Sequence, residues 1–194
     1  MSTITTAHSA SVDGFIADAD HGSDQLHGWL RAGDTPSRLN PAFTMSAPSA
    51  EFFDSGVGRC GAVIAGRRTY EVSGGWSGMG PMPGLPLFVM THRVPDDVPA
   101  GEPAYSFVTE GIERAIEQAQ TAAAGKDVVL MGASIVQQCL RARLLDELII
   151  SLVPVVLGRG VRLLDGLEPG DVELHIQSVL DAPGVTHLTY RVLR

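Results

Sequence analysis

The sequence predicts a single α/β domain, spanning residues 1–194, with a mostly parallel sheet, flanking helices and an antiparallel strand pair at its C-terminal end. Three observations predict it. Apolar segments typical of buried strands alternate with amphipathic segments typical of helices. The last stretch reads as two strands with no helix between them. A chain of 194 residues with 44% hydrophobic and 19% charged residues suits one folded domain with a full core.

Composition also narrows the class of function. The formal net charge of −8 argues against nonspecific nucleic-acid binding. No apolar run approaches the roughly 18–20 residues that a membrane span needs, and "MSTITTAHSA" lacks the basic region and apolar core of a secretion signal. We therefore expect a cytoplasmic protein without nucleic-acid or membrane partners. Cys60 and Cys139 are expected to be buried thiols rather than a disulfide or a metal pair.

The elements of the first half follow from apolar runs and their punctuation. A strand is expected near residues 3–10, followed by the loop "SVDGFIADADHGSDQ", and prolines make residues 26–47 irregular. A helix near residues 48–55 precedes the apolar strand "GAVIAG", after which "RRTYEVS" opens another helix. The stretch "GGWSGMGPMPG" is too rich in glycine and proline for regular structure, and "LPLFVMT" is the next strand.

The second half continues the alternation. After the strand "PAYSFV", Thr109 is placed to cap a helix whose apolar positions recur at i, i+3, i+4 and i+7. "DVVLM" is a buried strand and "GASIVQQCLRAR" a helix, while "LLDELIISLVPVVLG" is a long strand broken or bulged at Pro154. The tail reads as two antiparallel strands around "DAPG". The apolar face of the first of these helices consists of Ile112, Ala115, Ile116 and Ala119.

Several motifs match only in part. "GVGRCG" fits the dinucleotide pattern G-x-G-x-x-G, but a helix precedes it and a strand follows, the reverse of what that site needs. "GAVIAGRR" resembles a triphosphate loop without its lysine. "DADHGSD" resembles a calcium loop whose glycine comes one place early, and we expect no metal site. No serine lies in a G-x-S-x-G turn, so nothing supports a nucleophilic hydrolase.

One strand-to-helix junction carries an unusual charge pattern. Gly66 lets the chain turn, and Arg67, Arg68 and Thr69 fall in the first helical turn. The partial positive charge of a helix N-terminus repels arginines there by about 0.3–1 kcal/mol each. A bound anion would reverse that sign through charge-assisted arginine bonds of about 1.5–3 kcal/mol each. Alternatively, the arginines point into solvent or toward acidic residues such as Glu71.

Two further strand ends suit an anionic ligand. Gly132 lies between a buried strand and a helix, as at sites where a pyrophosphate approaches the backbone closely, although a lone glycine is also a common turn. The strand "LFVM" ends in Thr91, His92 and Arg93. Open α/β sheets bind ligands at the carboxyl ends of their strands. Together, the three ends predict one elongated anionic ligand across that edge.

The order of four stretches resembles a known superfamily. "SVDGFIAD", "GAVIAGRRTYE", "LPLFVMTHR" and "MGASIVQQCLRARLLDELIISLVPVVLGRG" occur in the order seen in the dihydrofolate-reductase-like superfamily. The chain is most similar to the reductase domain of the riboflavin-biosynthesis deaminase-reductase and its stand-alone relatives. The resemblance covers about residues 4–193 and implies NADPH as cofactor, with a dihydrofolate-reductase-like fold.

The resemblance also implies roles for individual residues. The first junction would hold cofactor phosphates, the next strand end would lie near the adenosine 2′-phosphate, and the later junction would hold the pyrophosphate. Met131 replaces the first glycine of a Gly-Gly turn, which puts the backbone twist there in question. The S-x-D-G-x-I-A stretch would lie near the nicotinamide. The implied cofactor residues are Ile16, Ala17, Gly66, Arg67, Arg68, Thr69, Thr91, His92, Arg93, Gly132, Ala133, Ser134 and Ile135.

Hydride transfer needs no protein nucleophile but usually needs a proton donor. Dihydrofolate reductases resemble each other in a buried acid on the first long helix. Glu51 and Asp54 lie three apart on the expected helix and are candidates, as is Asp13 in the first loop. The alternatives are that Glu51 and Asp54 are exposed acids and that Asp13 fixes the turn at Gly14.

Residues that contact the substrate are harder to place. Trp29 and Trp76 lie in the two least regular loops, where they either line a flat-ligand pocket or cover the core. Arg159 in "LGRG" is a candidate for a second anion site.

The main hypothesis is an NADPH-dependent oxidoreductase acting on CH–NH, C=N or C=O groups of a small heteroaromatic substrate of the pyrimidine or pterin kind. It resembles 5-amino-6-(5-phosphoribosylamino)uracil reductase. Reduction in the riboflavin pathway itself is less expected, because no deaminase domain is attached. The alternative is a non-catalytic ligand-binding or resistance protein that keeps the fold and the nucleotide site. The family is commonly dimeric, so a homodimer is expected, with "LLDELIISLVPVVLG" pairing or packing between subunits.

Overall fold

The structure is a computed structural model that describes residues 2–101 and 105–193. Its helices are α1 (Ala47–Arg59), α2 (Arg67–Val72), α3 (Ile112–Ala123) and α4 (Ala133–Arg141), with 3₁₀ turns η1 (Asp24–Leu26), η2 (Gly28–Arg31) and η3 (Gly74–Gly78). Its strands are β1 (Ile4–Ser11), β2 (Phe15–Ala17), β3 (Thr35–Pro36), β4 (Thr44–Met45), β5 (Cys60–Gly66), β6 (Leu87–Met90), β7 (Ser106–Val108), β8 (Asp127–Met131), β9 (Glu147–Val153), β10 (Val161–Arg162), β11 (Glu173–Ala182) and β12 (Val185–Leu193).

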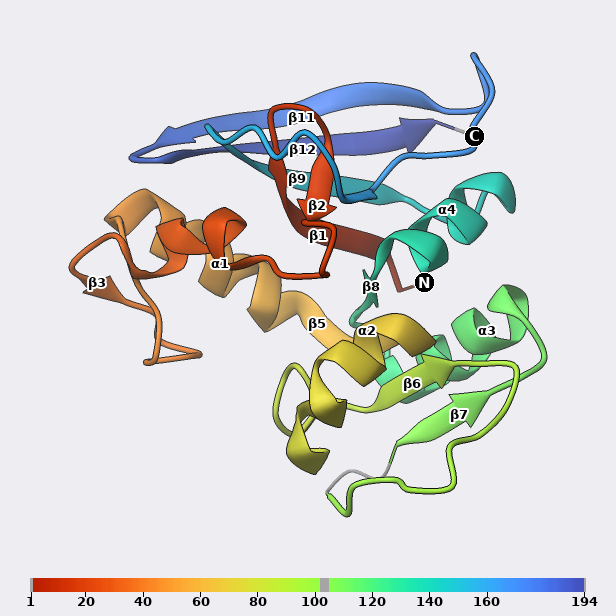
Figure 1. Cartoon of the computed structure of the whole chain (residues 1–194). Coiled ribbons are helices and arrows are strands. Elements are labelled where there is room, and N and C mark those ends of the chain that lie inside the picture. The colour runs from red at the N-terminus through yellow and green to blue at the C-terminus, as the bar shows by residue number, and fades with distance from the viewer. Residues whose placement is uncertain (1, 102–104, 194) are drawn as a thin grey trace. The chain divides into compact units, whose positions relative to one another are not determined.

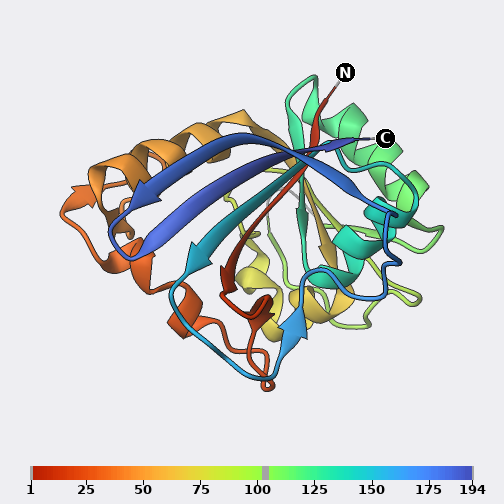
Figure 2. The ribbon, with the colours of Figure 1, turned by 90° about the horizontal axis from the view of Figure 1, so that it is seen from above.

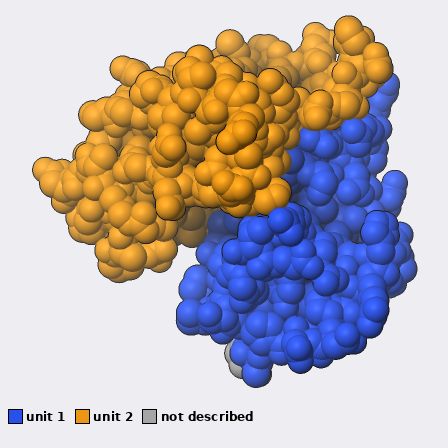
Figure 3. Space-filling model, in the orientation of Figure 1, with its two compact units in different colours: residues 1–6, 60–146 blue, residues 7–59, 147–194 orange. Residues whose placement is uncertain are grey.

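Eight of the described strands form one mixed sheet flanked by helices, which confirms the predicted α/β fold class (Figure 1). The strand order is β11-β12-β9-β1-β8-β5-β6-β7, and the pairs β10-β2 and β3-β4 lie outside this sheet. The chain divides into two compact units (Figure 3). Unit 1 comprises the described parts of residues 1–6 and 60–146, and unit 2 those of residues 7–59 and 147–194.

Unit 1 is built on parallel pairing. Strand β5 pairs in parallel with both β6 and β8, β6 pairs with β7, and the start of β1 pairs with β8. Parallel neighbours require crossover connections, and the connection between the neighbours β5 and β6 contains α2. Because parallel strands run the same way, the carboxyl ends of β5, β6, β7 and β8 lie at one edge of the sheet.

Both faces of β5 are covered, and every one of its residues is buried. Val63 and Ala65 pack in a cluster with Tyr70 of α2. Gly66 approaches Ile135 of α4 so closely that a Cβ on Gly66 would lie 3.3 Å from the Ile135 side chain. The predicted continuous apolar strand is therefore confirmed, as is the apolar face of α3, whose positions 112, 115, 116 and 119 are all buried.

Unit 2 contains the antiparallel strands. Strand β12 pairs with β9 on one side and β11 on the other, and the turn between β11 and β12 contains Gly184 at φ +78°. The predicted hairpin around "DAPG" is thus confirmed. Figure 2 shows β9, β12 and β11 side by side, face on.

The expectation for "LLDELIISLVPVVLG" is confirmed for the break at Pro154 and corrected for strand pairing between subunits. The strand ends at Val153, one residue before Pro154, because proline cannot donate to a sheet ladder. The strand order also places β9 between β12 and β1, so β9 has no free edge for pairing with another subunit. In unit 2 the edge strand of this sheet is β11, on which Leu174, Ile176 and Val179 are exposed. A homodimer remains a prediction, which sedimentation velocity can test.

Two loops are more ordered than their composition predicts. Residues 26–47 contain the 3₁₀ turn η2, the last residue of η1 and the short pair β3-β4, because Leu26, Leu30 and Met45 are buried in the core of unit 2. The stretch "GGWSGMGPMPG" contains η3, in which Trp76 and Ser77 adopt left-handed φ angles of +48° and +52°. Glycine content alone does not predict such turns, which depend on tertiary packing.

The start of α3 also differs from the prediction. Its N-cap is Gly111 at φ +102°, and no side chain caps the helix. The N–H and hydroxyl of Thr109 instead donate to the carboxylate of Glu110 at 2.8 and 3.1 Å. The predicted strand "PAYSFV" is described only from Tyr105 onward, where β7 begins at Ser106; positions 103 and 104 lie outside the described residues.

The structure also describes the two cysteines and the lengths of the helices. Cys60 and Cys139 are both buried free thiols, as predicted. Among the helices that the structure describes, none is long and apolar enough to cross a membrane.

A fully buried histidine anchors the core of unit 2. His187 on β12 has no exposed surface, and its Nδ1 and Nε2 lie 2.9 Å from Ser151 Oγ and 3.0 Å from Ser49 Oγ. Its ring stacks on Phe52 with centroids 4.2 Å apart. Burial lowers the pKa of His187 from 6.5 to about 4, so the folded protein holds this ring neutral at physiological pH.

This histidine predicts a pH-dependent stability. As pH falls through 6.5, an unfolded chain protonates His187 while the folded protein does not, so stability present above pH 6.5 is lost progressively toward pH 4. Burial also lowers the pKa of His8 to about 4, which adds to the loss.

We expect His187→Gln to reduce the slope of unfolding free energy against pH between pH 6.5 and 5. The reduction is at most about 1.4 kcal/mol per pH unit, the value for one proton. Urea unfolding at stepped pH measures this slope. An unchanged slope in the variant would show that His187 does not carry the effect.

Candidate functional site

A pocket of about 720 Å³ lies in unit 1 at the carboxyl ends of β5, β6 and β7, beside the first turns of α2 and α4. Every residue that lines it belongs to unit 1. Both the residues that follow the strands and the first turns of the helices supply charged and polar side chains. The lining consists of Gly66, Arg67, Arg68, Glu71, Met90, Thr91, His92, Arg93, Val108, Thr109, Gly111, Ser134, Ile135 and Gln138.

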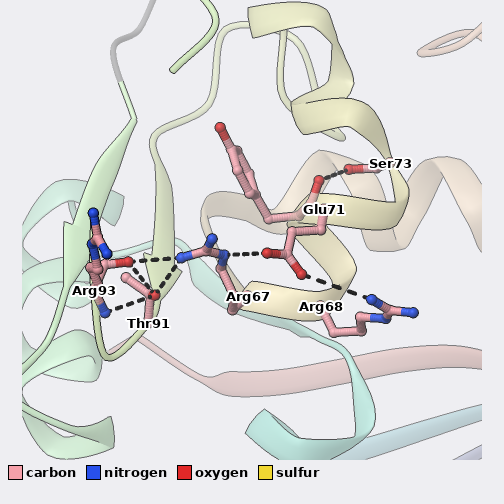
Figure 4. Close-up of polar contacts among 7 residues, drawn as sticks. Arg67, Arg68, Glu71, Ser73, Thr91 and Arg93 are labelled. Atoms are coloured by element: carbon pink, nitrogen blue, oxygen red, sulfur yellow. Dashed lines mark hydrogen bonds and ion pairs between the residues drawn. The ribbon is translucent and has the colours of Figure 1, made fainter. Parts of the chain in front are cut away.

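The guanidinium of Arg67 lies between α2 and the residues that follow β6 (Figure 4). Its Nε donates to Glu71 Oε1 at 2.7 Å. Its Nη1 donates to Thr91 Oγ1 at 3.1 Å and to the Arg93 carbonyl oxygen at 2.8 Å. The side chain is therefore held in one orientation by three contacts, from two separate segments of unit 1.

Hydrogen bonds also hold the segment that follows β6 in place. The hydroxyl of Thr91 donates to the Arg93 carbonyl at 2.7 Å, and the Thr91 N–H donates to the Val108 carbonyl of β7 at 3.0 Å. Arg93 points its guanidinium toward Asp96 at 3.2 Å and remains 81% exposed. Arg68 is 66% exposed, with its Nη1 4.0 Å from Glu71. Three arginines and one glutamate thus line the pocket, an excess of positive charge.

The two glycine junctions predicted from the sequence lie against each other. Gly132 has φ +102°, and a Cβ there would lie 2.4 Å from Thr69 Oγ1 and 4.0 Å from the Gly66 nitrogen. The ends of β5 and β8 can approach this closely only with glycine at position 132. Met131 is not in the left-handed region, so the conformation that favours glycine is confined to Gly132.

Most of the implied cofactor residues of unit 1 therefore line the same pocket. The pocket lining includes Gly66, Arg67, Arg68, Thr91, His92, Arg93, Ser134 and Ile135. Thr69, Gly132 and Ala133 lie outside the lining, at the contact between the two junctions or next to it. Ile16 and Ala17 lie on β2, in unit 2.

Comparison with known proteins identifies the family. Residues 2–188 match the family described as the RibD C-terminal domain. The chain belongs to the RibD C-terminal domain family. Among curated proteins, no match was found.

Solved structures share the fold of this RibD C-terminal domain. A putative riboflavin biosynthesis protein from Shewanella sp. PV-4 has a TM-score of 0.76 at 24% identity, and each chain is covered completely. Dihydrofolate reductase from Enterococcus faecalis, complexed with NADP(H), has a TM-score of 0.61 at 13% identity, with 99% of this chain and 97% of that one covered.

A longer relative matches in part. The Thermotoga maritima diaminohydroxyphosphoribosylaminopyrimidine deaminase/5-amino-6-(5-phosphoribosylamino)uracil reductase has a TM-score of 0.64 at 14% identity. The match covers 99% of this chain and 57% of that protein. At these identities the structural matches show a shared fold.

Some pocket residues were not predicted. Thr109 and Gly111 follow β7, whose carboxyl end lies at the same sheet edge as those of β5 and β6. The rule that ligands bind at the carboxyl ends of strands is the signal for both residues, although the sequence around Thr109 favours a helix cap. Gln138 lies one helical turn after Ser134, and its amide donates to the Ser134 carbonyl at 3.1 Å. Helical spacing from Ser134 is the signal for Gln138.

The three candidate acids lie in unit 2 and have distinct environments. The Asp13 carboxylate accepts from the N–H groups of Leu157 and Gly158 at 3.1 and 2.7 Å. A hydrogen bond from Ser11, together with these two, lowers the pKa of Asp13 to about 2. Asp13 therefore fixes a loop contact and is ionised at neutral pH.

Asp54 is buried on α1, as expected for an acid on the first long helix, but its oxygens are engaged. Ser37 donates to Oδ1 at 2.5 Å, and the Arg38 N–H and Nε donate to Oδ2 at 3.0 and 3.1 Å. The Ser37 bond, followed by those from Arg38, lowers the pKa of Asp54 to about 2. Glu51, one helical turn earlier, is exposed. Asp54 thus tethers residues 37 and 38 to α1.

The three candidate substrate residues differ in how deeply they are buried. Trp29 is buried in the core of unit 2, where its Nε1 donates to Ser9 Oγ at 2.9 Å and its ring meets His187 edge-on. This burial agrees with the interpretation that Trp29 covers the core. Trp76 is partly buried against the apolar cluster of unit 1. Arg159 is exposed between β9 and β10.

The contact between the junctions predicts a specific instability. We expect Gly132→Ala to destabilise unit 1 by the strain of a left-handed alanine, about 1–2 kcal/mol, plus about 1–3 kcal/mol for displacing Thr69. Gly125→Ala is the matched control, because Gly125 has φ +90° and open space around its Cβ position. Urea denaturation measures the unfolding free energy of both variants. Equal losses of stability would mean that the contact between Gly132 and Thr69 is not tightly packed.

Proposed function

We propose that this protein is an NADPH-dependent reductase that transfers hydride to a small heteroaromatic substrate of the pyrimidine or pterin kind. The proposed reaction is of the type catalysed by 5-amino-6-(5-phosphoribosylamino)uracil reductase. The observation that carries the proposal is the pocket in which Arg67 is fixed between Glu71, Thr91 and the Arg93 carbonyl. Membership of the RibD C-terminal domain family supports it.

The pocket residues fit the phosphorylated end of NADPH. Arginine presents a planar fork of N–H donors that matches a phosphate. Arg67, Arg68 and Arg93 would take the 2′-phosphate on the adenosine ribose. Ser134 and Gln138 supply polar groups on the α4 side of the same pocket.

The glycine junctions fit the pyrophosphate. Gly66 and Gly132 carry no side chain where β5 and β8 end, which lets the two junctions pack together, with Ile135 beside Gly66 and Thr69 beside Gly132. In this proposal the backbone N–H groups at the start of α4 would contact the pyrophosphate. No side chain caps the first turn of α4, whose leading N–H groups lack intrahelical partners and attract anions.

When bound, NADPH supplies the hydride, and the protein's part is binding, orientation and exclusion of water. In this proposal the arginines fix one end of the ligand, and the strand ends set its direction along the sheet edge. Productive orientation of this kind contributes to rate because hydride transfer needs close contact between donor and acceptor.

The proposal predicts a selective loss in an arginine variant. We expect Arg67→Ala to weaken NADPH binding about 10- to 100-fold, because charge-assisted bonds to the 2′-phosphate contribute about 1.5–3 kcal/mol. NADH, which lacks this phosphate, should lose much less. Calorimetric titration with both dinucleotides measures the difference.

Arg114→Ala is the matched control, since Arg114 is a half-exposed arginine on α3, paired with Glu117 and outside the pocket lining. It removes the same charge and should leave both affinities unchanged. Equal weakening of NADPH and NADH by Arg67→Ala, or a similar effect of Arg114→Ala, would refute the assignment of Arg67 to the 2′-phosphate.

A second candidate function is a non-catalytic ligand-binding or resistance protein with the same nucleotide pocket. One observation favours it: Asp13 and Asp54 are engaged by backbone and side-chain donors, and the pKa of each is lowered to about 2. Neither carboxyl group therefore carries a proton to donate at neutral pH. Protonation of substrate in a working reductase would have to come from elsewhere, such as an ordered water.

Steady-state assays of NADPH oxidation separate the two functions. We expect turnover with at least one substrate from a panel of pyrimidines, pterins and quinones that includes the ribosylaminopyrimidine of the proposed reaction. The control omits the substrate and measures background oxidation. Saturable NADPH binding without turnover across the panel would instead support the binding protein.

A further inference from the structure

We propose that Glu71 sets how strongly the pocket selects a phosphorylated dinucleotide, by competing with the ligand's phosphate for Arg67. This inference rests on the proposed function, and it assigns to one acidic residue a role opposite to that of the arginines. Glu71 would weaken phosphate binding, and its neutral analogue would strengthen it.

The donors of Arg67 are divided between two sides. Its five N–H groups include one on Nε, two on Nη1 and two on Nη2. Nη1 serves Thr91 and the Arg93 carbonyl, and Nε serves Glu71 at 2.7 Å (Figure 4). Among the described residues, these contacts engage Nε and Nη1 of Arg67, so the two hydrogens of Nη2 can donate to a ligand.

A bidentate contact with phosphate needs two adjacent donors of the guanidinium. On the Nε–Nη2 side, one of these donors already points at the Glu71 carboxylate. A phosphate that docks on this side must share or displace Oε1 of Glu71. The second oxygen, Oε2, lies 4.0 Å from Arg68 Nη1, so the same carboxylate also offsets part of the charge of Arg68.

The orientation of Arg67 does not depend on Glu71 alone. Both Nη1 contacts come from the segment after β6 and remain when Glu71 changes. Glutamine also keeps an oxygen that can accept from Nε, so Glu71→Gln removes charge while preserving the acceptor. The glutamate side chain is 43% exposed, so water can replace its remaining contacts.

The helix has little need of this ion pair. An acid four residues after a base is the less favourable order for an i,i+4 pair, and exposed pairs contribute little. The placement of Glu71 in the pocket lining, in contact with Arg67, points to an electrostatic role toward a ligand.

The experiment compares Glu71→Gln with the unmodified protein by calorimetric titration of NADPH, NADH and adenosine 2′,5′-bisphosphate. We expect NADPH and the bisphosphate to bind about three- to tenfold more tightly to the variant, the order expected for removing one partly screened like charge beside a phosphate. NADH affinity should change less than twofold.

Glu117→Gln is the matched control. Glu117 pairs with Arg114 at 2.6 Å on α3, and its replacement makes the same change in net charge away from the pocket. Thermal unfolding of both variants without ligand provides a second readout. Similar midpoints would show that the affinity change in Glu71→Gln does not come from a change in stability.

Three results would overturn the inference: unchanged or weaker NADPH binding in Glu71→Gln, equal tightening of NADH, or equal tightening in Glu117→Gln. Each of these leaves the proposed function intact, because the unmodified protein still binds NADPH. If neither NADPH nor the bisphosphate binds the unmodified protein or the variant, both the proposed function and this inference are wrong.

Discussion

The three contacts of the Arg67 guanidinium are the interaction on which the pocket depends. They connect α2, which follows β5, with the segment that follows β6. Parallel pairing of β5 with β6 brings these two segments to the same edge, and the Thr91–Val108 hydrogen bond extends the arrangement to β7. The pocket is thus a consequence of strand direction, and Arg67 gives it a defined charge at a defined place.

The second constraint is the contact of two glycine corners. Because β5 and β8 are neighbours, their following turns must pass each other, and they do so where Gly132 faces Thr69. The left-handed conformation is confined to Gly132, so the methionine at position 131 is compatible with the turn. The sheet edge therefore offers backbone on one side and arginine side chains on the other, which suits a ligand with phosphates at separate positions.

Much of this arrangement could be predicted from the sequence, and the reasons for the exceptions are physical. The residues that follow each strand could be predicted to lie together, because alternating strand and helix segments indicate parallel strands. The carboxyl ends of parallel strands lie on the same side of the sheet. The sequence allows Arg67 either to bind an anion or to pair with Glu71. In the structure Arg67 donates to Glu71 and still lines the pocket, because a guanidinium has several donors. Thr109 is of a residue type that often caps helices, but Gly111 takes the N-cap position of α3 and Thr109 donates to Glu110.

Other exceptions depend on contacts distant in sequence. His187 pairs with Ser49, 138 residues away, so its burial leaves no local signal. Trp29 lies in an irregular segment but packs edge-on against that same histidine. Asp54 lies on the first long helix, where the sequence suggests a proton donor, and only the folded chain shows that Ser37 and Arg38 donate hydrogen bonds to its carboxylate. Composition and periodicity describe single segments, whereas these roles arise between segments.

A crystal structure with NADPH bound is the measurement that tests the central claim most directly. The account predicts the 2′-phosphate in hydrogen-bonding contact with Arg67 and the Glu71 carboxylate withdrawn from, or sharing, the Nε of that arginine. A structure with the adenosine phosphate elsewhere, and the Arg67–Glu71 contact still at 2.7 Å, would contradict it.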